Sequence, residues 1–144
     1  MKRLNESIIS FAMGSRSNVR SRVVLAIYVA CFGVGASNHA RDFLVYGWRP
    51  YSWGPLLLEA FWTSLILLDL LAIALILSRF RRSGLLLAAA IMISDVIANT
   101  YALVVLAIPA FGLAVSLQAT FLGFVLGSLP FVWPGSVPAW SEQQ

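Results

Sequence analysis

The chain has 144 residues, of which 60% are hydrophobic and only 11% are charged. A soluble domain carries about a quarter of its residues as charged side chains, so this composition excludes an ordinary soluble domain. The formal net charge is +4, but the basic residues flank apolar segments, which favours membrane orientation over nucleic-acid binding. Cys31 is the single cysteine, and it offers neither a disulfide framework nor a metal-ligand cluster.

Apolar segments long enough to cross a bilayer, which takes roughly 20 residues, follow one another along the chain. After a basic leader over residues 1–22, the first predicted span covers residues 23–42. A loop rich in Trp and Tyr leads to the second span, residues 55–78, which begins at a proline and stops before three arginines.

The third predicted span runs over residues 84–108, where Pro109 breaks the chain, and the fourth over residues 111–132. Pro130 and Pro134 mark its end, and a tail follows over residues 133–144. One domain over residues 23–132 is expected. We therefore predict an all-α membrane protein in which four transmembrane helices form an antiparallel bundle.

The basic residues predict the orientation of this multi-pass protein. Five Lys or Arg lie in the leader and three in the loop after the second span, whereas only Arg41 and Arg49 lie on the other side. Because Lys and Arg concentrate in cytoplasmic loops, the N-terminus is predicted to be cytoplasmic.

Three acidic side chains lie within the predicted spans: Glu59 and Asp69 in the second, and Asp95 in the third. Each costs roughly 2.5–3.5 kcal/mol in hydrocarbon, so each calls for a reason. At about 1.5 Å per residue, Glu59 lies near the outer interface, whereas Asp69 and Asp95 lie roughly 20 Å deep at a similar level. These depths predict an outer polar tier and a deeper acid pair.

Other polar residues complete this arrangement, and their helical spacing places several of them on shared faces. A histidine beside carboxyl groups in apolar surroundings is suited to proton transfer. We predict catalytic roles for three residues and substrate contacts for six, with no metal and no cofactor. The catalytic residues are His39, Asp42 and Glu59, and the substrate-binding residues are Trp62, Thr63, Asp69, Asp95, Asn99 and Gln118.

Each of these residues also has a structural interpretation. Asp69 and Asp95 can be protonated and then stabilise the bundle through hydrogen bonds to neighbouring helices. Glu59 can interact with the positive end of its helix, and His39 with headgroups or Asp42. The aromatic loop is typical of the belt that Trp and Tyr form at the membrane interface.

The polar positions resemble the EXPERA-domain family, which includes emopamil-binding protein, a sterol isomerase. The matching residues are His39 and Asp42, then Glu59, Arg79, the pair Asp95 and Asn99, and Gln118, within residues 23–132. The resemblance implies a four-helix core that shifts a double bond. An acid would protonate an alkene carbon, aromatic and carboxylate groups would stabilise the cation, and a base would remove a proton nearby.

The sequence thus predicts an intramembrane protein that binds a membrane lipid or another lipophilic, sterol-like or isoprenoid molecule, with acid–base isomerase or cyclase activity as the sharper hypothesis. The alternative is a non-catalytic small subunit that assembles with a larger membrane complex or with further copies of itself. Ion or proton transport through the deeper acid pair ranks last, because no polar residue continues a path on the cytoplasmic side.

Overall fold

The protein folds into four α-helices in the computed structural model, which describes residues 2–134, with side chains from residue 19 onward. The helices are α1 (Lys2–Tyr46), α2 (Leu56–Leu77), α3 (Arg81–Val104) and α4 (Phe111–Val132). Each contains a stretch that is long and apolar enough to cross a membrane. The predicted all-α four-helix membrane fold is confirmed.

Several helix boundaries differ from those expected from the sequence. The leader is continuous with the first span, so the predicted boundary at residue 22 falls inside α1. The third span ends four residues earlier than predicted, because Ala107 takes a positive φ of 54° and Pro109 disfavours helix at the residue before it. The first helix ends at Tyr46, four residues later than predicted, and α3 begins at Arg81, three residues earlier, whereas α4 covers residues 111–132 as predicted, with Pro130 in its last turn.

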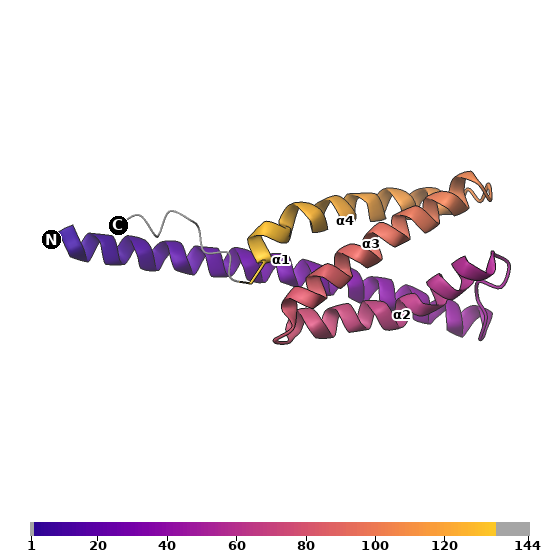
Figure 1. The fold of residues 1–144 in the computed structure, drawn as a ribbon, viewed down its shortest axis with the longest axis horizontal. Coiled ribbons are helices and arrows are strands. Elements are labelled where there is room, and N and C mark those ends of the chain that lie inside the picture. Colours follow the sequence, from indigo (N-terminus) through magenta and orange to yellow (C-terminus); the bar gives the residue numbers. More distant parts are fainter. Residues whose placement is uncertain (1, 135–144) are drawn as a thin grey trace.

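The helices pack in chain order, α1 on α2, α2 on α3 and α3 on α4, whereas α1 meets α4 over a shorter stretch. Figure 1 shows that the α1–α2 loop (residues 47–55) and the α3–α4 loop (residues 105–110) lie at one end of the bundle. The tight turn over residues 78–80 lies at the other end. Toward the two long loops, the α3–α4 pair diverges from the α1–α2 pair (Figure 1).

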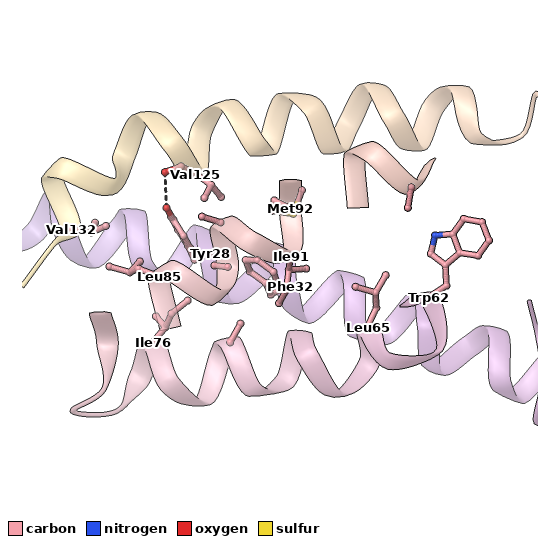
Figure 2. Packing of buried hydrophobic residues seen from close by; sticks show 14 of the residues in the cluster. Tyr28, Phe32, Trp62, Leu65, Ile76, Leu85, Ile91, Met92, Val125 and Val132 are labelled. Atoms are coloured by element: carbon pink, nitrogen blue, oxygen red, sulfur yellow. Dashed lines mark hydrogen bonds between the residues drawn. The ribbon is translucent and has the colours of Figure 1, made fainter. Parts of the chain in front are cut away.

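At the end near residues 78–80 the bundle is tightly closed. The Tyr28 hydroxyl donates to the Val125 carbonyl at 2.9 Å, which joins α1 to α4 (Figure 2). The same hydroxyl lies 3.0 Å from the Ser128 hydroxyl. Gly84 allows α3 to approach α2, because a Cβ there would lie 2.6 Å from the Ile76 backbone nitrogen. Leu85 and Ile76 are fully buried beside this contact (Figure 2).

The loop over residues 47–55 is folded rather than extended. Gly47 has a φ of +82°, a conformation that glycine adopts without steric cost. Two consecutive turns follow, closed by backbone hydrogen bonds from Ser52 to Arg49 and from Gly54 to Tyr51. These turns bring the loop back over the end of the bundle.

Candidate functional site

A pocket of about 1290 Å³ occupies the half of the bundle nearest the two long loops. Typical small-molecule sites measure about 300–1,000 Å³, so this pocket has room for a large lipophilic molecule. Its walls come from all four helices and both long loops. Its polar lining residues include Asn38, His39, Arg41, Asp42, Tyr46, Tyr51, Asp69, Asp95 and Gln118, and its apolar ones include Phe32, Leu65, Ile91, Met92, Phe111 and Phe121.

The pocket opens sideways, between α1 and α4. On α1 the exposed residues Cys31 and Val34 line it, and on α4 the exposed residues Leu113 and Leu117 do so. These positions lie in candidate membrane spans, and the exposed residues Asn38 and Arg41 of α1 line the pocket as well. The opening therefore has both apolar and polar exposed residues at its edge.

The two deep acids lie in the pocket walls. Asp69 is 4% exposed and Asp95 is 8% exposed, and both line the pocket. Asp69 lies against Gly35 of α1, where a Cβ would come 2.6 Å from the Asp69 carboxylate oxygen. Among residues 19–134, no side chain or backbone group forms a hydrogen bond with the Asp69 carboxyl. Asp69 is thus a buried acid whose available partner is whatever occupies the pocket.

Asn99 connects three helices through its amide group. Its oxygen accepts a 2.8 Å hydrogen bond from the Trp62 indole nitrogen on α2. Its nitrogen donates to Asp95 at 3.2 Å on the same helix and to the Gln118 oxygen on α4 at 2.7 Å. This network uses one carboxylate oxygen of Asp95 and holds the side chain in place beside the pocket.

His39, Tyr51 and Asp42 form a chain of hydrogen bonds at the loop end of the pocket. The Tyr51 hydroxyl donates to the Asp42 carboxylate at 2.7 Å, and the Nδ1 atom of His39 lies 2.9 Å from the same hydroxyl. Burial, and then the hydrogen bond and charge of Asp42, raise the pKa of Tyr51. The phenol therefore keeps its proton at physiological pH.

Glu59 forms a bidentate ion pair with Arg49 of the α1–α2 loop. The guanidinium Nε and Nη2 atoms donate to the two carboxylate oxygens at 2.7 and 2.8 Å. The hydrogen bonds and the charge of Glu59 raise the pKa of Arg49. Because the Arg49 side chain is 64% exposed, solvent weakens the pair, and its main consequence is to hold the loop against the start of α2.

Aromatic rings close the pocket at the loop end. Trp62 stacks on Phe111 with ring centroids 5.4 Å apart, and Trp53 packs on both rings. Tyr51 also contacts Trp62, at 5.6 Å between centroids. The aromatic loop is therefore not only an interfacial belt: Trp48 is 87% exposed, but Tyr51 is buried.

The structure brings five of the nine predicted site residues to the pocket: His39, Asp42, Asp69, Asp95 and Gln118. The pocket walls do not include the other four. Glu59 pairs with the loop, Trp62 and Asn99 bond to each other, and Thr63 is half-buried elsewhere on α2. The catalytic and substrate-binding roles of all nine residues stay predictions, and the pocket lining favours only the five that reach it.

Sequence reasoning missed the site roles of Tyr51 and Arg49. Both were assigned to the interfacial loop, and their contacts depend on the two turns that fold this loop back.

Within residues 19–134, no three His, Cys, Asp or Glu side chains gather as metal ligands. A second hollow of about 530 Å³, near Val19 and Phe131, is lined by Arg20 and Ser21 but by no carboxyl group.

Comparison with protein-family models, with curated proteins and with solved structures finds no match to this chain. The geometry of the pocket and the residues that line it are therefore the basis for a proposed function.

Proposed function

We propose that this membrane protein binds one lipophilic molecule of sterol-like or isoprenoid type in the pocket between α1 and α4. The observation that carries the proposal is the Asp69 carboxyl, which belongs to a residue only 4% exposed, lies in the wall of this pocket and forms no hydrogen bond with residues 19–134. A buried acid without a partner is costly in hydrocarbon. A ligand that supplies the missing hydrogen bond removes part of that cost.

The polar groups of the pocket specify the polar end of this ligand. Asp69 has both oxygens available, and the second oxygen of Asp95 takes part in no hydrogen bond with residues 19–134. Carboxylates accept hydrogen bonds, so this wall favours a ligand that donates one. A hydroxyl group at the end of an apolar isoprenoid or ring system fits both the acceptor wall and the apolar remainder of the pocket.

The sharper form of the proposal is acid–base isomerisation of such a ligand. A protonated pocket carboxyl would give its proton to an alkene carbon, and a base would remove a proton from a carbon next to the resulting cation. The double bond then moves and the ligand keeps its composition. His39 supports this form because it lines the pocket beside Asp42, whereas Glu59 is held in its ion pair with Arg49.

The basic residues also support a cytoplasmic N-terminus. Arg79, Arg81 and Arg82 lie at the turn over residues 78–80, which is the end of the bundle opposite the pocket. Under the positive-inside rule that end faces the cytoplasm. The pocket would then occupy the outer half of the bilayer, and its ligand would enter from the outer leaflet.

Photo-cross-linking tests the proposed binding site. The protein in lipid nanodiscs is exposed to a farnesol analogue that carries a diazirine, and the labelled peptides are mapped by mass spectrometry. We expect labels on α1 near Cys31 and Val34 and on α4 near Leu117, which line the pocket. An excess of unlabelled farnesol should remove these labels.

The lipid-facing residues of the other two helices provide the internal control. Leu67 on α2 and Ile97 on α3 are exposed but do not line the pocket. Equal labelling of these positions and of the pocket, without competition by farnesol, would contradict ligand binding. That result would favour the alternative of a non-catalytic subunit in a larger assembly.

A further inference from the structure

We infer that Tyr51 is a positioning residue, which holds the His39 imidazole as the Nδ1–H tautomer and leaves its Nε2 atom as the hydrogen-bond acceptor for the pocket ligand. The part played by Nε2 rests on the proposed function. The tautomer itself follows from the hydrogen bonds of Tyr51 with Asp42 and His39, and it can be measured without any ligand.

The Tyr51 hydroxyl has a single proton to donate. That proton is donated to the Asp42 carboxylate, which offers no proton in return. The hydroxyl oxygen can therefore only accept at its second contact, the 2.9 Å approach of His39 Nδ1. Nδ1 must carry the hydrogen in this contact, and in a neutral imidazole Nε2 then carries none.

In the described part of the chain, the second ring nitrogen of His39, a residue that lines the pocket, is left without a hydrogen-bond partner. His39 lines the pocket together with Asp42 and Tyr51, and Nδ1 is occupied by Tyr51. The Nε2 atom has no hydrogen-bond partner in residues 19–134. It is thus the ring nitrogen available to a ligand hydroxyl, and the atom that would remove a proton in an isomerisation.

Tyr51 is suited to this role because it is held from two sides. Its hydroxyl is tied to α1 through Asp42, and its ring packs between His39 and Trp62, with centroid distances of 6.2 and 5.6 Å. In a neutral histidine, the hydrogen bond made at one ring nitrogen determines which nitrogen carries the proton. In this protein the partner in that hydrogen bond is the Tyr51 hydroxyl, which lies on a loop, twelve residues along the chain from His39.

The chain contains one histidine, so nitrogen NMR with ¹⁵N-histidine reports on His39 alone. In the wild type we expect a neutral ring with the proton on Nδ1. Tyr51→Phe removes the acceptor for that proton, and Asp42→Ala frees the Tyr51 proton to turn toward Nδ1. Both variants should therefore shift the ring toward the Nε2–H tautomer. Tyr46→Phe is the matched control, since Tyr46 lines the pocket without bonding to His39, and it should leave the tautomer unchanged.

Circular dichroism confirms that each variant remains helical, and either Tyr51→Phe or Asp42→Ala suffices for the test. An Nε2–H tautomer or a doubly protonated ring in the wild type would overturn the inference. A tautomer that is the same in both variants as in the wild type would also overturn it.

Addition of farnesol separates the tautomer from the ligand contact. We expect the Nε2 resonance to move with farnesol but not with farnesyl methyl ether, which has no proton to donate. If farnesol cross-links in the pocket while Nε2 does not move, the His39 contact is wrong and the binding proposal stands. If farnesol neither cross-links nor moves the resonance, the binding proposal itself fails, whereas the tautomer result remains valid.

Discussion

Replacing Asn99 by leucine should remove about 2–4 kcal/mol of the free energy of unfolding, the largest stability loss we expect from a single substitution in this bundle. Asn99 makes three side-chain hydrogen bonds, to Trp62, Asp95 and Gln118. Interhelical hydrogen bonds in membranes contribute only about 0.6 kcal/mol each on average. Leucine lowers the free energy of unfolding further, because the side chains of Trp62, Asp95 and Gln118 then lack the hydrogen-bond partner that Asn99 provides within the bundle.

Unfolding in mixed micelles, followed by far-UV circular dichroism during titration with sodium dodecyl sulfate, measures this loss. Asn38→Leu is the matched control, because it makes the same replacement at an exposed position on α1. The control should stay within about 0.5 kcal/mol of the wild type. If the two variants are equally stable, the Asn99 network does not hold α2, α3 and α4 together.

Filling the pocket should abolish ligand binding without unfolding the protein. Ala114 lies on α4 in the pocket wall, and Ala114→Trp places an indole where the ligand would lie. We expect the yield of farnesol cross-linking at α1 to fall by on the order of tenfold or more, which corresponds to about 1.4 kcal/mol or more of binding free energy. Circular dichroism should show unchanged helix content.

Leu126→Trp is the control for this substitution. Leu126 lies on the same helix, is 47% exposed and does not line the pocket. The control should cross-link like the wild type. Equal cross-linking of all three proteins would show that the label reports contact with bulk lipid and would contradict a specific pocket.

The helices could be predicted from the sequence because each span is a long apolar block bounded by strong local signals. Pro55 and the arginines that follow residue 78 bound α2 closely. The end of α3 was predicted less well. The helix stops at Val104 in response to a turn with a positive φ at Ala107, and alanine gives no local signal for that conformation.

Within the site, burial in an apolar span is enough to predict where Asp69 and Asp95 lie. An aspartate deep in an apolar span must face the protein interior, and Asp69 and Asp95 do so. The contacts of Glu59 and His39 depend instead on how the loop over residues 47–55 folds. Two turns place Arg49 on Glu59, and they place Tyr51 between His39 and Asp42. The separation of these residues along the chain does not predict those contacts.

Native mass spectrometry of the gently purified protein, with identification of any molecule that it retains, tests the central claim most directly. We predict one stoichiometric sterol-like or isoprenoid molecule on the wild type and on Leu126→Trp, and none on Ala114→Trp. A wild-type protein that is empty, or that carries only bulk phospholipid to the same extent as Ala114→Trp, would contradict the proposed ligand-binding function.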